Sequence, residues 1–183
     1  MANKEPKVKV QNLTKRFGDL LVLDNLNFEV EEGEFLCIVG PTGCGKTTFL
    51  NSLTRLYEPT AGDILVNGIP VDPKKQNISY IFQEYSSFPW LTVEQNIRFG
   101  LEIKKTPKAE ADANVEEMLD IVGLTKFRNY YPSQLSISML QRVAIARAFA
   151  TKPELLLMDE PYGQLDIDLR FKLEDELIKL WKK

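Results

Sequence analysis

A glycine-rich stretch, GPTGCGKTT from Gly40 to Thr48, has the residue types and spacing with the clearest chemistry in the chain. It fits the pattern G-x-x-x-x-G-K-[ST], in which a short loop leads from a strand into a helix. Glycines let the backbone turn with its amides facing inward, and the helix N-terminus adds positive potential. The stretch therefore predicts a loop that binds the phosphates of a nucleotide.

The residues of this loop have separate expected roles. The Lys46 ammonium is expected on the β- and γ-phosphates, the Thr47 hydroxyl in the coordination sphere of Mg²⁺, and Thr48 on a phosphate. A plain strand-to-helix turn is the alternative, but such a turn needs neither three glycines nor a lysine at this place. The other residues expected to line the phosphates are Gly40, Pro41, Thr42, Gly43, Cys44 and Gly45.

Two acids follow an apolar run in LLLMDE, Leu155 to Glu160. The run predicts a buried strand, and the carboxyl end of such a strand is where open α/β sheets bind ligands. Asp159 is a candidate to hold Mg²⁺ through water, and Glu160 to polarise an attacking water. Solvated acids at the start of a loop are the alternative, but the phosphate loop elsewhere in the chain favours the catalytic interpretation.

Two other side chains could belong to the site or have only a structural role. Gln83 ends the strand-like segment ISYIFQ, and its amide could meet both a metal-bound water and a neighbouring loop. Phe17, in KRFG, could offer an aromatic face to a purine, although a core phenylalanine fits its position equally well.

Hydrophobic periodicity predicts the elements that position these residues. Alternation over 8–13 and 21–30 predicts antiparallel strands, and the continuous apolar run FLCIV, 35–39, predicts a strand buried on both faces. Helical periodicity follows the phosphate loop and dominates the second half, with Thr106 as a possible cap and Gly123 as a stop. Further strands are expected at 62–68, 78–83 and 155–158, and helices at 47–57, 92–101, 107–122, 141–151 and 167–181.

Ser138 and Gln141 stand three residues apart at the head of QLSISMLQRVAIARAFA, 134–150. This spacing predicts a capping box, in which each side chain satisfies a backbone amide of the first helical turn.

Composition excludes several classes of protein. The chain has 183 residues, 44% of them hydrophobic, with a net charge of -3 and a pI near 5.2, so no nucleic-acid partner is expected. No apolar run approaches the roughly 20 residues that span a bilayer, so no direct membrane insertion is expected. Two cysteines without metal-ligand or disulfide spacing favour a reducing compartment.

In order along the chain, the motifs resemble those of the ATP-binding subunit of ABC transporters. GPTGCGKTT resembles the Walker A motif, Gln83 the Q-loop, LLLMDE the Walker B motif, and GQLD, 163–166, the D-loop. The resemblance implies an α/β P-loop NTPase with a RecA-like core and an antiparallel β subdomain, 1–83 and 153–183. A helical subdomain, 84–152, would be inserted, and the C-terminal strands of the family would be missing.

The resemblance also implies a function. Family members bind ATP and Mg²⁺ and hydrolyse ATP to power solute import, with two ATP-binding subunits forming a homodimer. They work with membrane subunits and lie peripherally on the cytoplasmic face of the cell membrane. FPWLTV, 88–93, is most similar to the nitrate, sulfonate and taurine importers, although a hydrophobic staple onto the following helix is an equal alternative.

The sequence departs from the family at two places. LSISM, 135–139, stands where the family reads LSGGQ or LSGGM; Ser136 is kept to reach the γ-phosphate of the partner's ATP, but Ile137 and Ser138 replace glycines. A β-branched residue disfavours positive φ, so closure of the dimer should be weakened. The chain also has no histidine, whereas the family carries a switch histidine on a later strand, so a truncated chain with reduced hydrolysis is expected.

Two other functions are alternatives to an ATPase. A non-catalytic nucleotide-binding or assembly module would partner intact subunits without turning over ATP. A P-loop protein that acts on DNA would need long coiled-coil heptads between its Walker motifs, and the sequence has none.

Overall fold

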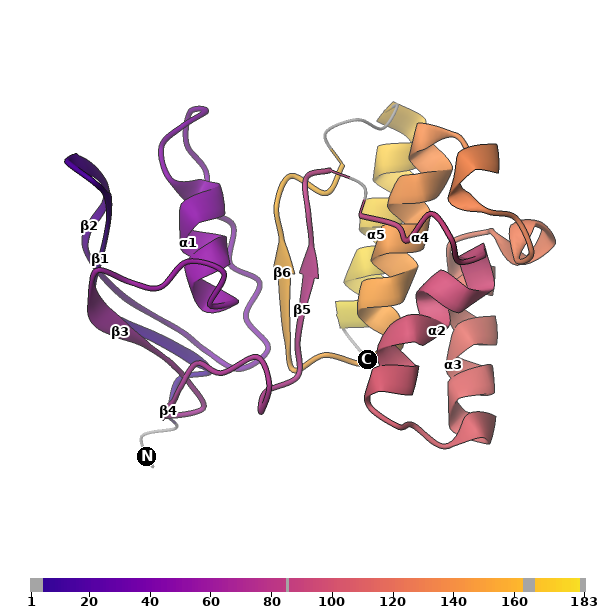
Figure 1. Ribbon diagram of the computed structural model, residues 1–183, viewed down its shortest axis with the longest axis horizontal. Helices are drawn as coiled ribbons and strands as arrows, with labels where there is room; N and C mark the ends of the chain where they lie inside the picture. The colour runs from indigo at the N-terminus through magenta and orange to yellow at the C-terminus, as the bar shows by residue number, and fades with distance from the viewer. Residues whose placement is uncertain (1–4, 85, 163–166, 182–183) are drawn as a thin grey trace. The chain divides into compact units, whose positions relative to one another are not determined.

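The structure, a computed structural model, describes residues 5–84, 86–162 and 167–181. The chain forms two compact units, 1–76 and 77–183, each with its own secondary structure (Figure 1). The family-based division into 1–83, 84–152 and 153–183 remains a prediction.

An antiparallel sheet forms most of the N-terminal unit. Its order is β2-β1-β3-β4, so β1 pairs with both β2 and β3. The strands predicted over 8–13 and 21–30 are confirmed, and both are longer than expected. The strands are β1 (Val8–Phe17), β2 (Leu20–Val30), β3 (Ala61–Val66) and β4 (Ile69–Pro70).

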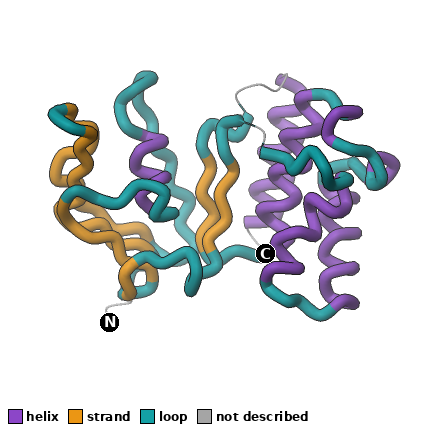
Figure 2. The backbone as a smooth tube through the Cα atoms, in the orientation of Figure 1, coloured by secondary structure: helices purple, strands orange, loops and turns teal. Residues whose placement is uncertain are grey.

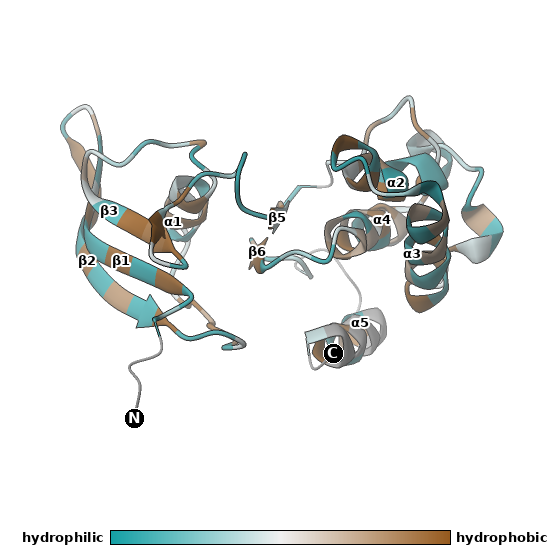
Figure 3. Cartoon of the chain, turned by 90° about the horizontal axis from the view of Figure 1, so that it is seen from below, coloured by the Kyte–Doolittle hydropathy of each residue, from teal (hydrophilic) through white to brown (hydrophobic). Residues whose placement is uncertain are grey.

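Alternating side chains give this sheet one buried face. Val8, Val10 and Leu13 of β1 are all at most 3% exposed, and the bands of alternating hydropathy along the sheet are visible in Figure 3. Helix α1 (Lys46–Leu53) packs on β2 through the rings of Phe28 and Phe49, whose centroids are 5.4 Å apart. The helix ends earlier than the predicted 57.

The predicted buried strand over 35–39 is wrong. The segment is drawn as loop between β2 and α1 in Figure 2, and its large side chains are exposed, Val39 by 84%. A strand buried on both faces requires neighbours that complete its hydrogen-bond ladders. In the described part of the chain, neither sheet contains this segment, so the apolar composition alone does not make it a strand.

The C-terminal unit combines two parallel strands with helices. Strands β5 (Ile78–Ile81) and β6 (Leu155–Met158) pair in register from Ile78–Leu155 to Ile81–Met158, close to the predicted positions. The helices are α2 (Val93–Ile103), α3 (Lys108–Ile121), α4 (Ile137–Ala150) and α5 (Ile167–Trp181), with short 3₁₀ turns at Thr125–Phe127 and Pro132–Gln134.

Helix α4 is the common packing partner within this unit. On one side, Val143, Ala146 and Ala150 join a core with α2 and α3. On another side, Ile145 and Ala148 pack against Ile81 of β5. Figure 1 shows α4 beside both the helices and the strand pair. The near-continuous small and apolar sequence of α4 explains how it can be covered on two sides.

Helix ends agree with the sequence in part. Thr92 caps α2 with a full capping box to Gln95, and Gly123, at φ 65°, follows the end of α3. Thr106 is not the cap of α3, because Pro107 occupies that position without a side-chain cap.

The predicted capping box of Ser138 and Gln141 is also wrong. Helix α4 begins at Ile137, earlier than predicted, and its N-cap is Ser136, whose Oγ accepts from the Met139 amide at 3.3 Å. Ser138 therefore lies in the first turn, with its Oγ 3.1 Å from that of Ser136. This leaves the Gln141 side chain for another partner.

Candidate functional site

The glycine-rich loop adopts the conformations that only glycine takes easily. Gly43 and Gly45 have φ of 82° and 102°. A Cβ at Gly45 would lie 3.0 Å from Leu23 Cδ2 and 3.2 Å from the Val22 carbonyl oxygen, so the backbone here is close to β2. Any side chain at this position would therefore be strained both by its φ and by its neighbours.

Lys46 folds back over this loop. Its Nζ donates to the carbonyl oxygens of Gly40, at 2.9 Å, and Pro41, at 3.2 Å. The ammonium is thus held against the loop that would surround the phosphates. Since carbonyl oxygens are weaker partners than phosphate oxygens, this arrangement is ready to exchange them for a charged ligand.

Helix α1 points its first turn at the same loop. Its first backbone bond runs from the Phe49 amide to the Gly45 oxygen at 2.9 Å, so the amides of 46–48 have no acceptor within the helix. Thr47 is exposed and Thr48 is half-buried. Amides, an ammonium and a hydroxyl at one helix start fit a polyphosphate with its Mg²⁺.

Phe17 is not a core residue. Its side chain is 42% exposed, and its ring meets that of Tyr57 edge-on, with centroids 5.3 Å apart. The Lys15 Nζ lies 4.8 Å from the centre of the Phe17 ring. An exposed ring with a cation on it is compatible with stacking on a purine, and the contact of Phe17 with the base remains a prediction.

In the C-terminal unit the structure brings the predicted glutamine and acids together. Gln83 Nε2 donates to Glu160 Oε2 at 3.2 Å, and the Tyr80 hydroxyl donates to Asp159 Oδ2 at 3.3 Å. Asp159 is 4% exposed, whereas Glu160 is exposed. A buried carboxylate beside an exposed one, both at the carboxyl end of a strand, is suited to one structural and one reactive role.

The backbone explains how the acids reach this position. The Asp159 amide donates to the Ile81 carbonyl at 3.0 Å, which extends the β5–β6 pairing by one residue. Glu160 follows at φ 47°, a left-handed conformation unfavourable for glutamate. The chain therefore turns sharply at Glu160 while its carboxylate stays beside Gln83.

Ser136 lies at the N-terminus of α4, and its side chain is exposed. Ile137 and Ser138, which replace the glycines of the family's signature, lie in the right-handed first turn, and Ile137 is 47% exposed.

The predicted site residues divide between the units, with Phe17 and 40–48 in one and Gln83, Ser136, Asp159 and Glu160 in the other. The predicted D-loop, 163–166, lies outside the described residues.

Some contributors were missed by the sequence analysis. Nothing in the local pattern marks Tyr80 as a partner of Asp159, because 79 residues separate them. Lys15 could have been suspected, since it lies two residues before Phe17 on the same face of a strand. The sequence predicts that Gln141 caps a helix, yet its Nε2 donates to the carbonyl of Pro161, next to Glu160.

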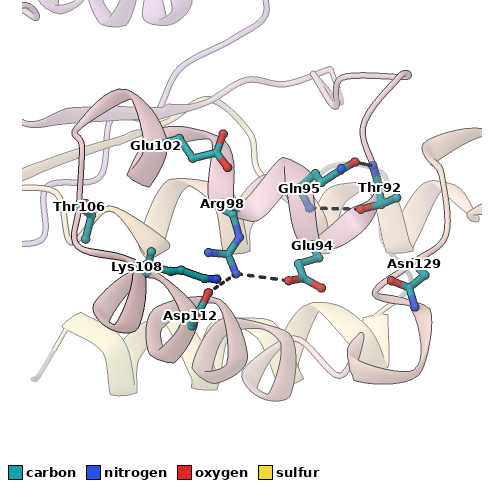
Figure 4. A pocket seen from close by; sticks show the side chains of 10 residues that line it. Thr92, Glu94, Gln95, Arg98, Glu102, Thr106, Lys108, Asp112 and Asn129 are labelled. Carbon is teal, nitrogen blue, oxygen red and sulfur yellow. Dashed lines mark hydrogen bonds and ion pairs between the residues drawn. The ribbon is translucent and has the colours of Figure 1, made fainter.

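A separate cleft of about 700 Å³ lies between α2 and α3 (Figure 4). Three of its charged side chains form ion pairs: Arg98 bonds to Asp112 at 2.7 Å and to Glu94 at 3.3 Å. Arg128 also bonds to Glu94 and holds the pKa of that carboxyl below its usual range. The bond between Arg98 and Asp112 therefore links α2 to α3.

Among the helices that the structure describes, none is long and apolar enough to cross a membrane. The described residues also contain no cluster of three or more His, Cys, Asp or Glu side chains that could hold a metal ion by themselves.

A glycine-rich loop that leads into a helix with Lys46 and Thr47 in its first turn, together with acids at the end of a parallel strand, indicates the class of P-loop nucleotide-binding proteins. Comparison with known proteins narrows this class: the family profile described as ABC transporter matches residues 23–163. The chain belongs to this family, as an ABC-type ATPase domain.

Several relatives are similar over nearly the whole chain. An uncharacterized ABC transporter ATP-binding protein of Methanocaldococcus jannaschii is 46% identical over 97% of this chain and 68% of its own length. The sulfate/thiosulfate import ATP-binding protein CysA of Synechocystis sp. is 46% identical over 93% of this chain and 49% of its own length.

A solved structure of the ATP-binding cassette MJ0796, a dimer in a post-hydrolysis state bound to ADP and phosphate, has a TM-score of 0.86. It is 34% identical, and the match covers 95% of this chain and 82% of the cassette. The likeness confirms the predicted fold class.

Proposed function

We propose that this chain binds MgATP and hydrolyses it to power solute import through membrane subunits. The loop of Gly40, Pro41, Thr42, Gly43, Cys44 and Gly45, with Lys46, Thr47 and Thr48, would hold the phosphates, and Phe17 the base. The observation that carries the proposal is the hydrogen bond between Gln83 and Glu160, because it places a carboxylate and an amide together at the end of a strand.

The chain's own residues suggest how the reaction would proceed. Glu160 is exposed and would accept a proton from the attacking water, while the Gln83 amide would orient both the carboxylate and that water. Mg²⁺, when bound, would neutralise charge on the phosphates; Thr47, Gln83 and Asp159 are the residues that would hold it or its waters. The Tyr80 hydroxyl would keep Asp159 in place.

A second copy of the chain is the proposed partner in hydrolysis. Ser136 would contact the γ-phosphate on the partner's nucleotide, which suits its exposed place at a helix N-terminus. The dimeric state of the MJ0796 cassette supports such an arrangement. We also propose that this chain lies in the cytoplasm, at the inner face of the cell membrane.

The proposed solute class depends on the segment before α2 and on one relative. Phe88 packs on Phe99 of α2, with ring centroids 4.4 Å apart, and Trp90 is 70% exposed. Phe88 is thus packed onto the following helix, as the alternative of a hydrophobic staple expects, whereas Trp90 is exposed. We propose an importer of oxyanions such as nitrate, sulfonates or taurine, and the import role named for CysA supports an oxyanion.

A non-catalytic nucleotide-binding module is the second candidate, and one observation favours it. Ile137 and Ser138 lie in the helical first turn of α4, and their side chains would stand between the amides of this turn and a partner's phosphate. Binding would then persist while hydrolysis failed.

Two measurements on the purified chain separate these candidates. Calorimetry with MgATP tests binding, and steady-state phosphate release, with and without a full-length homologue, tests hydrolysis. Release of about 1 per second or faster would establish an ATPase. Binding without release in either mixture would leave the non-catalytic module, and no heat with millimolar MgATP would contradict both.

A further inference from the structure

Helix α4 contacts both of the loops that carry the Gln83–Glu160 pair. The first contact is made by Gln141, which is 5% exposed and donates from Nε2 to the Pro161 carbonyl at 2.5 Å. Pro161 directly follows Glu160. A buried amide bonded to this carbonyl therefore restrains the backbone on the far side of the proposed base.

The second contact is made by Arg147, farther along the same helix. Its guanidinium donates to the carbonyl oxygen of Ser86 at 2.8 Å and to its Oγ at 2.7 Å. It also lies 5.1 Å from the centre of the Phe88 ring. Ser86 is three residues beyond Gln83, so Arg147 restrains the loop after the glutamine.

The other end of each loop is fixed by the sheet. Gln83 follows β5, which ends at Ile81, and Glu160 follows β6, which ends at Met158. The Asp159 amide joins the two strand ends through the Ile81 carbonyl. Each loop is thus held by a strand on one side and by α4 on the other, and the 3.2 Å bond between Gln83 and Glu160 lies between these supports.

We propose that Gln141 and Arg147 are positioning residues for ATP hydrolysis, which act by holding the Glu160 loop and the Gln83 loop against α4. The inference rests on the proposed function of Glu160. The role of both residues is indirect, and a displacement of about 1 Å at a reacting group is enough to slow a reaction 100-fold.

The same helix supplies a matched control. Arg142 is also half-buried and donates to a backbone carbonyl, that of Val122, at 2.8 Å. Val122 follows α3 and belongs to neither loop. Losing this bond should weaken the fold much as losing the other two does, without displacing Gln83 or Glu160.

The test compares Gln141→Met, Arg147→Met and Arg142→Met in the full chain by kcat, KM for ATP and melting temperature. We expect kcat to fall about 10–100-fold in the first two, with KM changed less than about twofold. Arg142→Met should lower the melting temperature comparably and keep kcat within about twofold. Arg147→Lys, which retains a cationic donor, should recover part of the lost kcat.

A double-mutant cycle tests whether Gln141 affects hydrolysis through Glu160. Adding Gln141→Met to Glu160→Gln should lower the residual rate no further, because the base that Gln141 positions is already gone. Additive losses would contradict the proposal, as would equal losses of kcat in all three methionine variants, or no loss in the first two.

The wild-type chain separates this inference from the proposed function. If the wild type released no phosphate, the proposed function would fail on that measurement alone. Hydrogen exchange of peptides covering 82–88 and 158–162 would then decide whether α4 holds the loops. Faster exchange in Gln141→Met and Arg147→Met than in Arg142→Met supports the anchoring, and equal exchange overturns it.

Discussion

The two units form their predicted functional sites in different ways. In the N-terminal unit the phosphate loop consists of backbone: Gly43 and Gly45 turn it, and Lys46 bonds to carbonyls within it. In the C-terminal unit the pair of Gln83 and Glu160 is made by side chains that distant elements bring together. A backbone site depends on residues adjacent in sequence, whereas a side-chain site depends on how the helices and strands pack.

The two units also differ in how deeply their side chains are buried near these sites. Every residue from 31 to 40 is exposed, so the chain before the phosphate loop contributes no buried side chain to a core. In contrast, Ile97, Val115, Leu119 and Ala146 are fully buried between α2, α3 and α4. Substitutions at the two predicted groups should therefore affect nucleotide binding in the first unit and hydrolysis in the second.

The largest effect should come from Glu160→Gln. Removing the proposed base should lower the rate of phosphate release about 100–1000-fold, while the affinity for ATP remains unchanged. Phosphate release and calorimetry measure the two quantities. Glu110→Gln, an exposed change on α3, is the control; equal rates in the two variants would exclude Glu160 as the base.

Lys46→Ala should have the next largest effect, this time on binding. The loss of charge-assisted bonds to phosphate should weaken ATP affinity about 10–100-fold, or about 1.4–2.8 kcal/mol. Lys9→Ala, which breaks only a surface pair with Glu29, should leave affinity unchanged. Unaltered calorimetric affinity in Lys46→Ala would contradict the assignment of the phosphate loop.

Asn96→Leu tests the dependence of the second unit on side-chain bonds. Asn96 is fully buried, accepts from the Phe88 amide at 2.8 Å and donates to the carbonyls of Phe88, Leu91 and Thr92. Leucine has a similar volume but leaves these groups unpaired, so the free energy of unfolding should fall by about 1–3 kcal/mol.

Urea unfolding measures this loss. The exposed Asn129→Leu should change the free energy of unfolding by less than about 0.5 kcal/mol. Equal values for the two variants would show that the bonds of Asn96 add no stability.

The smallest effect concerns pH. Bonds to Arg128, and secondarily to Arg98, lower the pKa of Glu94 in the folded state below its ordinary 4.5. The ionised carboxylate therefore stabilises the fold above pH 4.5, and this contribution is lost as the pH falls through the lower, folded pKa.

Glu94→Gln should accordingly lower the free energy of unfolding by about 1 kcal/mol at pH 7, with the difference from wild type shrinking below pH 4.5. Urea titrations at several pH values measure it. A difference that stayed constant down to the folded pKa and below it would contradict this linkage.

The sequence predicts these two kinds of site unequally well. The phosphate loop, the β1–β2 pair and the helices α2 to α5 follow from local patterns and lie close to their predicted positions. The segment 35–39 does not form its predicted strand, because strand formation depends on partners that composition does not reveal. The spacing of Ser138 and Gln141 predicts a capping box, but Ser136 is the N-cap of the helix, and Gln141 bonds to Pro161 instead.

Glu160 has a left-handed backbone, with φ 47°, that glycine or asparagine would adopt with less strain. Selection for thermal stability alone should thus enrich those two residues at position 160, and selection for turnover should remove them. A library of variants at position 160, selected once for thermal stability and once for turnover, should therefore enrich different amino acids in the two selections.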